Sequence, residues 1–593
     1  MISQSPAIVD ADSPYDPTAF ADTIIRTSDN VHFYILGNFL SYVSQVFRDL
    51  FDLNRGAAVE QNEKKDGYPV IPLLDDSATL RFLLDLIHPR IEERQLDDVT
   101  LFWNVSRAAK KYCMDIIEGK LRARILTSDL INEGPFRIYA IATDLEWGDV
   151  ADIAACKTLN IPLKDLKYGE ELESINGASF YRFMKYRLRC EASDKPQEVH
   201  LSTVIITPDV TPDRLDSSPP PAVVDVPSDD LGCFCVTNSA LTEEGGTIPV
   251  TKRISGAEST TIYTCHVVVA KGRSYNCELL PDLSRTTLPR LPCGATGISM
   301  NATFCSSTTT DLILRSSDSI DFFVIGALVR LVSPIFDEMF PLKEHGSKDG
   351  LPIIPVQESS KVLLPLLRVV YHDMDDLDTQ DWELYQEIFL TIRKYKMTSI
   401  ERKLRKQVET SSLILSQPLR IYILATMLGW KEVRKAAALN TLLQSLSEMS
   451  YVSELSLVTG ADLYRLVRFR FKCGDEACKA LEAYGFTSYG VDSWKTYSRG
   501  SRSYHPQRLD WRQKLMACPR GSTIADAYTR EIEEARKRGE RFDFSYDIFP
   551  RIIECMHGAE KVVEEAVSRV CFNMLFIDIE LINLHQVLAL EFD

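Results

Sequence analysis

The sequence predicts an α+β protein with two similar units, each a small, mostly antiparallel sheet flanked by helix pairs and followed by an all-helical extension. Three observations carry this prediction. A strand–turn–strand–helix pattern at 21–51 recurs at 310–340. The helical pattern that follows it recurs at a constant offset. A segment rich in proline, serine and aspartate separates the two copies. A mostly helical tail completes the predicted architecture.

Each copy opens with two short strands. Thr23–Ile25 and the run at 31–35 are rich in β-branched and aromatic residues, which favour strands. Asp29-Asn30 between them favours a turn, because these side chains bond nearby backbone. After Gly37, apolar residues recur every three or four positions, which predicts one face of a helix. In the second copy, Ser333-Pro334 is typical of a helix start, so we expect this helix to break in two.

The rest of the first copy predicts a polar loop, an edge strand and then helices. Residues 52–67 are polar and lack periodicity, and Tyr68–Leu73 is a short strand whose prolines suit an edge. Asp75-Asp76-Ser77 is a helix cap, and His88-Pro89 ends that helix. The pattern from 134 to 190 consists of helix pairs, which gives the unit an α/β head and a helical back.

The second copy follows the first without further gaps over the helical part. Tyr112 corresponds to Tyr395, which gives an offset of 283 residues, and Gly177 corresponds to Gly460 by the same offset. The hairpins need an offset of 289, from Asp22 to Asp311, so the loop between is six residues longer in the first copy. Insertions of this kind belong in surface loops, which supports the alignment.

These patterns divide the chain into seven segments. They are a disordered N-terminus at 1–14, a first head at 15–127, its helical extension at 128–192, a linker at 193–308, a second head at 309–410, its extension at 411–485, and a mostly helical tail at 486–593. The first part of the linker has little to bury and is expected to be flexible. A strand-like run at 261–270 interrupts its later part.

Composition argues against nucleic-acid and membrane partners. The net charge is −17, and we find no basic face or stripe of the kind that phosphate binding needs. No apolar run approaches the roughly 20 residues that cross a bilayer, and the N-terminus lacks the features of a secretory signal. We therefore expect an intracellular protein, cytoplasmic or nuclear, whose 14 cysteines are mostly reduced thiols.

The sequence contains no pattern that indicates catalysis. The familiar phosphate-binding, metalloprotease and hydrolase motifs are absent, and the nine histidines form no evident cluster. We therefore expect no enzyme activity, no catalytic residues, no cofactor and no metal. One alternative stays open, a nucleus-associated regulator with a small zinc module in the linker, although the spacing lacks a C-x-x-C pair. Its candidate ligands are Cys233, Cys235, Cys265, His266, Cys277, Cys293 and Cys305.

The ordered series of strands and helices resembles the BTB/POZ domain family, and the helical extension is similar to the helical backs that often follow such domains. The recurring features in the first copy are Asp22, Ser44, Phe47, Phe51, the Ile71-Pro72-Leu73 strand, and Tyr112 in the 108–114 helix. Many family members carry His-Lys after the second strand, where this chain has Leu36-Gly37 and Ile325-Gly326. This departure argues against any function that relies on that charged pocket.

The resemblance implies a protein-interaction scaffold or adaptor that forms homo- or hetero-dimers through the strand-and-first-helix face. It also implies docking to a cullin scaffold as a ubiquitin-ligase substrate adaptor. Because the unit is duplicated, the two copies are expected to be able to pair in cis, at an effective concentration of roughly millimolar. The candidate partner-interface residues are Phe39, Val43, Phe47, Phe51, Leu328, Val332, Phe336 and Phe340.

Overall fold

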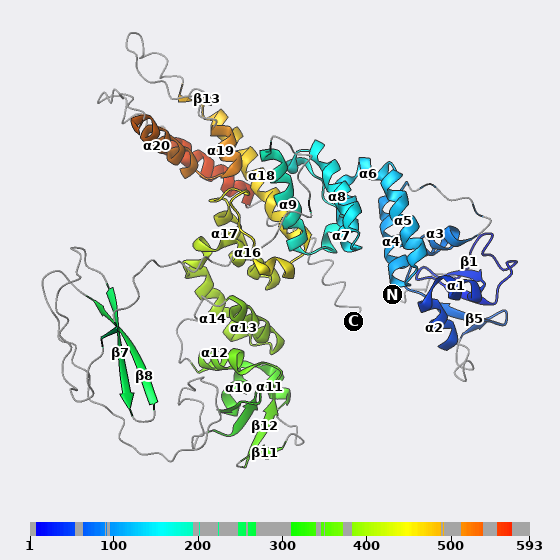
Figure 1. Cartoon of the computed structure of the whole chain (residues 1–593), viewed down its shortest axis with the longest axis horizontal. Helices are drawn as coiled ribbons and strands as arrows, with labels where there is room; N and C mark the ends of the chain where they lie inside the picture. Colours follow the sequence, from blue (N-terminus) through cyan, green and yellow to red (C-terminus); the bar gives the residue numbers. More distant parts are fainter. Residues whose placement is uncertain are drawn as a thin grey trace, which may run out of the picture.

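The computed structural model describes most of the two units and parts of the linker and tail. The described residues are 8–53, 63–88, 91, 95, 97–193, 201, 223–224, 247–256, 259–268, 310–339, 346–348, 350–371, 382–487, 490–491, 511–537, 554 and 556–571. Figure 1 shows two α/β heads at separate ends of a helical body, which the extensions of both units build together.

The head of the first unit contains a five-stranded sheet. Its strands are β1 (Val9–Asp10), β2 (Thr23–Arg26), β3 (Val31–Ile35), β4 (Lys64–Lys65) and β5 (Tyr68–Pro72), in the order β1-β3-β2-β5-β4. β2 and β3 form the predicted antiparallel hairpin, and β5 lies parallel to β2. β1 lies parallel to β3, so the sheet is mixed.

The N-terminal strand corrects one expectation. The sequence predicts disorder for residues 1–14. Residues 1–7 lie outside the described residues, and within 8–14 the strand β1 is part of the sheet. The Val9 amide donates to the Asn30 carbonyl at 3.1 Å, and the Ala11 amide donates to the His32 carbonyl at 2.9 Å. Asp10 also forms an ion pair with Lys65. These partners are distant in sequence, so local composition could not reveal the pairing.

Helices cover one face of this sheet. They are α1 (Gly37–Val43), α2 (Gln45–Leu53), α3 (Ser77–Ile87), α4 (Val99–Lys111) and α5 (Asp115–Thr127). Alternate strand residues point to opposite faces. Accordingly, Ile25, Phe33 and Ile71 join the main core, whereas Ile24, Tyr34 and Val70 form a small separate cluster.

The second head repeats this topology. Its strands are β9 (Leu312–Arg315), β10 (Asp321–Val324), β11 (Ser347–Lys348) and β12 (Leu351–Pro355), in the order β10-β9-β12-β11, which matches β3-β2-β5-β4. Its helices are α10 (Gly326–Val332), α11 (Pro334–Met339), α12 (Ser360–Val370), α13 (Trp382–Lys394) and α14 (Thr398–Thr410). Within the described residues, no strand of this head corresponds to β1.

Each head continues into a helical extension. The first consists of α6 (Leu130–Glu133), α7 (Pro135–Asp144), α8 (Gly148–Lys157), the short 3₁₀ turns η2 (Thr158–Asn160), η3 (Leu163–Asp165) and η4 (Glu170–Glu173), and α9 (Gly177–Ala192). The second consists of α15 (Leu413–Ser416), α16 (Pro418–Met427), α17 (Lys431–Thr441), η8 (Ser453–Leu457) and α18 (Gly460–Ala483).

A buried arginine fixes the end of each extension. Arg187 on α9 donates to the carbonyls of Thr158 and Ile161 at 2.5 Å each. Arg470, at the equivalent position of α18, donates to the carbonyls of Thr441 and Gln444. Both arginine side chains are buried, and each joins the last helix of its extension to the loop that follows the preceding helix.

The tail packs on the second extension. It contains α19 (Trp511–Ala517), α20 (Ser522–Lys537) and a helix at 556–571. Arg520 joins these helices to the rest, because it pairs with Glu564 at 2.9 Å and donates to the Leu439 carbonyl at 3.3 Å. Two short strands, β13 (Phe486–Thr487) and β14 (Gly490–Val491), follow α18.

The linker contains a small sheet of β6 (Val223–Val224), β7 (Thr247–Gly256) and β8 (Ser259–Val268). β8 covers most of the strand expected at 261–270, and β7 pairs with it along ten positions. Cys265 and His266 lie on β8, whereas Cys233, Cys235, Cys277, Cys293 and Cys305 lie outside the described residues.

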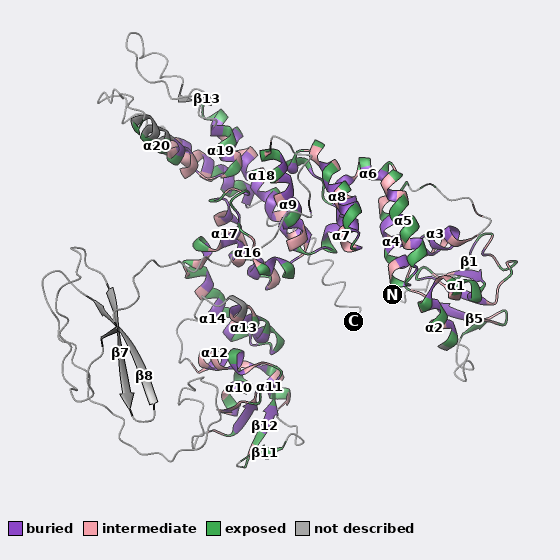
Figure 2. Ribbon diagram, viewed as in Figure 1, coloured by how far each residue is buried: buried purple, intermediate pink, exposed green. Residues whose placement is uncertain are grey.

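Buried residues of both units and the tail form one continuous apolar core. Figure 2 shows buried residues running along α9 and α18, where the two extensions meet. In the described ranges, none of the helices has the length and apolar character needed to cross a membrane.

Candidate protein-interaction surfaces

An aspartate that immediately precedes the first strand of the hairpin binds the start of the first helix in each head. The Gly37 amide donates to Oδ1 of Asp22 at 2.6 Å, and the Gly326 amide donates to Oδ1 of Asp311 at 2.5 Å. A Cβ at Gly37 would lie 3.2 Å from Oδ1 of Asp22, so glycine permits this close approach. Strand and helix are therefore joined in the same way in both heads.

A buried serine ends this first helix. Ser44 Oγ donates to the Tyr112 carbonyl at 2.5 Å and accepts from the Phe47 amide at 3.1 Å. Ser333 makes the same two bonds, to the Tyr395 carbonyl at 2.6 Å and from the Phe336 amide at 3.2 Å. The serine thus breaks one helix into α1 and α2, or α10 and α11, which confirms the predicted break in the second unit.

The structure divides the predicted interface residues into two groups. Phe47, Phe51 and Phe336 are buried in the core, with Phe47 fully inaccessible and stacked on Tyr112 at 4.5 Å between ring centroids. These three cannot line a partner surface, because helix packing within their own head already covers them. Phe39 is 39% exposed. Val43, Leu328 and Val332 are half-buried, and Phe340 lies outside the described residues.

The most exposed apolar residues of these helices were missed. Tyr42 is 80% exposed and Leu331 is 81% exposed, and the hairpin offset of 289 makes them equivalent. A signal for them existed in the sequence, an apolar residue every third position beside the core stripe. It is formed by Leu36, Phe39 and Tyr42 in the first unit and by Ile325, Leu328 and Leu331 in the second. We call these the α1 face and the α10 face.

The two faces carry little charge on a chain whose net charge is −17. No charged residue occurs between Leu36 and Phe47. On α10 the charged residue is Arg330, and its Nε pairs with Asp337 at 2.6 Å. Beside the α1 face, the Arg48 guanidinium of α2 donates to the Ser41 carbonyl. Water-exposed apolar side chains such as Tyr42 and Leu331 suit an apolar protein partner better than a charged one.

A second surface joins the two units, at the N-termini of α9 and α18. The Gly177 amide donates to the Val458 carbonyl at 2.7 Å, and the Gly460 amide donates to the Ile175 carbonyl at 2.6 Å. Asn176 and Thr459 form an antiparallel bridge between these bonds. Because the offset of 283 relates Ile175 to Val458 as well as Gly177 to Gly460, the contact has an internal two-fold relationship.

Tyrosines extend this symmetry. Tyr181 Oη donates to the Met449 carbonyl and Tyr464 Oη donates to the Leu166 carbonyl, both at 2.7 Å. Met449 and Leu166 are again equivalent positions. The rings of Tyr181 and Tyr451 lie 5.6 Å apart between centroids, and the corresponding rings of Tyr464 and Tyr168 lie 5.9 Å apart. We call this set of contacts the junction.

Some junction contacts occur on one side alone. Glu173 pairs with Arg465, and its Oε2 accepts from Thr459 Oγ1 at 3.0 Å. Its counterpart in the second unit is Ser456, and the counterpart of Arg465 in the first unit is Arg182. Serine has no carboxylate, so it cannot form the equivalent ion pair. On the other side, Lys185 donates to the Ser447 carbonyl at 2.6 Å, and burial lowers the pKa of its ammonium group.

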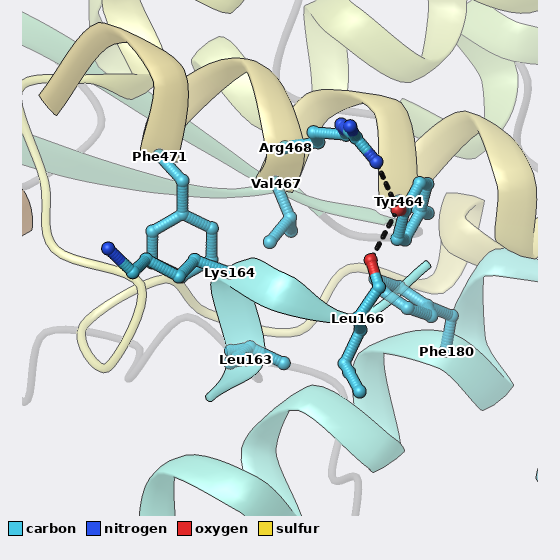
Figure 3. Close-up of a pocket in the computed structure, with 8 residues that line it drawn as sticks. All are labelled: Leu163, Lys164, Leu166, Phe180, Tyr464, Val467, Arg468 and Phe471. Atoms are coloured by element: carbon cyan, nitrogen blue, oxygen red, sulfur yellow. Dashed lines mark hydrogen bonds between the residues drawn. The ribbon is translucent and has the colours of Figure 1, made fainter. Parts of the chain in front are cut away.

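A small hollow lies on the Tyr464 side of the junction (Figure 3). It is lined by Leu163, Lys164, Leu166, Phe180, Tyr464, Val467, Arg468 and Phe471. Arg468 turns toward Tyr464 and donates to its Oη at 2.9 Å, whereas the equivalent Lys185 bridges to the opposite unit. The hollow therefore reflects a difference in packing between the two sides.

The junction is a contact between the two units that the sequence did not predict. The resemblance implies dimerisation through the strand-and-first-helix face, and the hypothesis of cis pairing names no surface. The junction joins η4 and α9 of the first extension to η8 and α18 of the second. Sequence reasoning had aligned Gly177 with Gly460 but had no signal that equivalent residues touch each other. In the part of the chain that the structure describes, no group of three or more metal-ligating side chains occurs.

Comparison with known proteins identifies one domain. Residues 300–412 match the family model of the BTB/POZ domain, which takes in β9–β12 and α10–α14. The family resemblance drawn from the sequence is confirmed for this part of the second unit. A search of curated proteins gave no match for the chain.

Proposed function

We propose that this chain, which carries a BTB/POZ domain at residues 300–412, is a non-enzymatic protein-interaction scaffold with two such units. BTB/POZ domains mediate protein–protein interaction and dimerisation. The observation that carries the proposal is the exposure of Tyr42 and Leu331 at equivalent positions of the first helices. In this proposal the α1 face and the α10 face each bind a protein partner.

Several contacts support treating the first unit as a second BTB/POZ-like domain. Its strands β3-β2-β5-β4 have the order of β10-β9-β12-β11 in the matched domain. Asp22 and Ser44 make the bonds that Asp311 and Ser333 make. These groups set the start and the end of the first helix, so both heads present that helix in the same way.

Burial of the exposed side chains supplies the free energy for binding. Moving a Leu or a comparable apolar side chain out of water is worth about 1.5–3 kcal/mol. A partner that covers Tyr42, Phe39 and Leu36 together gains this contribution without leaving a charged group unpaired. A few such buried anchors commonly dominate an interface.

The cis arrangement supports a scaffold role. The junction buries parts of α9 and α18 and does not involve the first helix of either head. The α1 face and the α10 face therefore remain accessible to other molecules. One chain can then hold two partners at a fixed separation. The family match also supports the finer proposal of a ubiquitin-ligase adaptor that docks a cullin scaffold. Co-purification of a cullin with the full chain tests that role.

Substitution of the two exposed residues tests the main proposal. The full chain and its Tyr42→Ser, Leu331→Ser and doubly substituted variants are used as baits in quantitative pull-downs from the native host. Each single variant is expected to lose a subset of captured proteins and the double variant to lose both subsets. Leu74→Ser is the matched control, because Leu74 is 87% exposed but corresponds to the polar Gln357. Unchanged capture by the double variant would contradict the proposal.

A further inference from the structure

The sheet of the second head has an edge that its counterpart in the first head does not expose. In the first head, β1 lies parallel to β3, and the Ala11 amide donates to the His32 carbonyl at 2.9 Å. The hairpin offset of 289 makes β10 the equivalent of β3. Within the described residues, no strand pairs with the outer edge of β10, at Asp321 and Phe323. Unpaired amide and carbonyl groups on such an edge attract a further strand.

We propose that residues 298–304 of the same chain occupy this edge as a short strand parallel to β10, in the way that residues 9–15 occupy the edge of β3. Residues 298–304 lie outside the described residues, and they are identified as the occupant by their sequence and by the side chains of the edge. This occupancy is independent of partner binding at the α1 face and the α10 face.

The segment has the pattern and the spacing of the strand that it would match. By the offset of 289, its apolar residues stand at apolar positions of the first head: Ile298 at Val9, Met300 at Ala11 and Phe304 at Tyr15. Tyr15 precedes Asp22 by seven residues, and Phe304 precedes Asp311 by seven. Since Ala11 and Tyr15 are buried in the first head, the equivalent side chains of the segment have an apolar surface to cover.

One carboxylate serves a lysine at this edge in each head, but it comes from a different strand. In the first head, Asp10 of β1 forms an ion pair with Lys65, and Nδ1 of His32 lies 3.2 Å from the Lys65 ammonium group. Lys348 is the equivalent of Lys65, and it pairs at 2.7 Å with Asp321 of β10 itself. The second head therefore supplies the carboxylate that the first head takes from β1.

The segment matches this difference, because Ser299 stands at the position of Asp10. In the register of the first head, this residue lies beside Asp321. An acid there would face a carboxylate that Arg315 already binds at 2.7 Å, and like charges at facing positions destabilise a pair of strands. The same repulsion argues against β1 of a second copy as the occupant, since β1 would bring Asp10 to Asp321.

The aromatic residue of the segment matches a second difference between the heads. Tyr15 Oη donates to Oδ1 of the buried Asp85 at 3.1 Å. The offset of 283 places Arg368 at the position of Asp85, and an arginine side chain cannot accept a hydrogen bond. The segment brings Phe304 to this place, and phenylalanine has no hydroxyl group to satisfy. Two separate positions of the segment thus agree with the head that follows it.

Hydrogen exchange of the full chain, measured by mass spectrometry, tests this occupancy. Because β1 donates two amides to β3, the equivalent amides of Ile298 and Met300 are expected to exchange slowly in the wild-type chain. The Phe323 amide of β10 is expected to share this protection. Ser299→Asp should accelerate exchange at all three amides by at least about tenfold, since it places a second carboxylate beside Asp321.

Two further variants isolate the charge from other effects. Addition of Asp321→His to Ser299→Asp rebuilds the arrangement of the first head around Lys348, and it is expected to restore slow exchange. Ser307→Asp is the control, because it adds the same charge at the position of the exposed Thr18 and should exchange as wild type. Slow exchange at β9 and β12 in every variant verifies that the second head is folded.

Fast exchange at 298–300 in the wild-type chain overturns the inference, as does a Ser299→Asp chain that exchanges like wild type or a double variant that restores nothing. Protection of Phe323 that disappears when residues 1–14 are deleted would assign the edge to β1 of another copy, and it would overturn the inference as well. Capture of proteins by the α1 face and the α10 face is measured separately, so a failure there leaves this result unchanged.

Discussion

Gly177 and Gly460 donate their backbone hydrogen bonds across the junction in opposite directions, Gly177 to Val458 and Gly460 to Ile175. Each acceptor precedes the equivalent glycine by two residues. The two units of one chain therefore meet as the two subunits of a symmetric dimer would. Each glycine lies so close to the other unit that a Cβ at its position would come within 3 Å of an atom there.

Addition of a methyl group at these glycines is expected to open the junction. A Cβ at Gly177 would lie 2.8 Å from the Leu455 carbonyl, whereas at Gly460 it would meet the movable side chain of Ile175 at 2.7 Å. Overpacking of this kind costs about 1–3 kcal/mol, and we expect Gly177→Ala to cost more than Gly460→Ala because backbone moves less readily. Thermal unfolding and small-angle scattering measure the loss of stability and the increase in size.

The control for this pair is Gly119→Ala on α5. Gly119 is exposed, and nothing lies within 4 Å of a Cβ built there. Alanine in a helix interior is favoured over glycine by up to about 1 kcal/mol, so this variant should be slightly more stable than wild type. A Gly177→Ala chain that matched this control would contradict the described junction.

Removal of the junction hydroxyls should loosen the contact without a clash. Tyr181→Phe and Tyr464→Phe each lose one hydrogen bond to a carbonyl of the other unit, worth about 0.5–1.5 kcal/mol. Tyr464→Phe also removes the acceptor of Arg468, so it should cost more than Tyr181→Phe. We expect faster hydrogen exchange at 172–176 and 455–459 in both variants. Tyr139→Phe is the control, since its hydroxyl donates to Ser179 of the same unit at 2.9 Å. It should destabilise the first extension and leave exchange at 455–459 unchanged.

The heads were predictable because their signals are local. Asp29-Asn30, Gly37 and the apolar spacing of α1 each act within a few residues, and the repeat gave every signal twice. The junction was not predictable from the same data. Tyr181 and Tyr464 follow a helical apolar pattern whether they face their own core or the other unit. The presence of these tyrosines in both copies does not tell packing within a unit from packing between units. A residue needed for either kind of packing would occur at equivalent positions of both copies.

Loss of the serine between the first two helices should destabilise a head. Ser44→Ala leaves the Tyr112 carbonyl and the Phe47 amide without their partner in a buried site, at a cost of about 1–3 kcal/mol. Urea unfolding measures the loss of free energy. Ser41→Ala is the matched control, because Ser41 bonds to the Gly37 carbonyl within its own helix and should change stability by less than about 0.5 kcal/mol.

The first head should lose stability in mild acid because of His32. Burial, and secondly the nearby Lys65, lower the pKa of this imidazole below the usual value of 6.5. The folded head then binds fewer protons than the unfolded chain below that pH, so its stability is fully present above about pH 6.5 and falls as the pH drops toward the folded pKa. Hydrogen exchange at β2 and β3 should accelerate between these limits.

The variant His32→Leu should remove most of this acid response. The groups that face the imidazole are Lys65, Asp10, Arg26 and Glu63, and their own titration continues in the variant. The second head offers an internal comparison. Its equivalent residue, Asp321, has a lowered pKa because Arg315 and then Lys348 bind it, so its contribution persists until stronger acid. Equal acid sensitivity of both heads would show that His32 has no special role.

The ion pair between Glu173 and Arg465 has a consequence for how this protein can change over time. In a dimer of identical chains, a mutation at the interface appears on both sides of the axis at once, and both copies must tolerate it. Here the two sides are encoded separately, so one side can acquire a carboxylate while the other keeps Ser456. The outer faces differ in the same way, because Tyr42 and Leu331 are different residues at equivalent positions. A chain that contains its own dimer partner is free to evolve two different binding specificities on one symmetric frame.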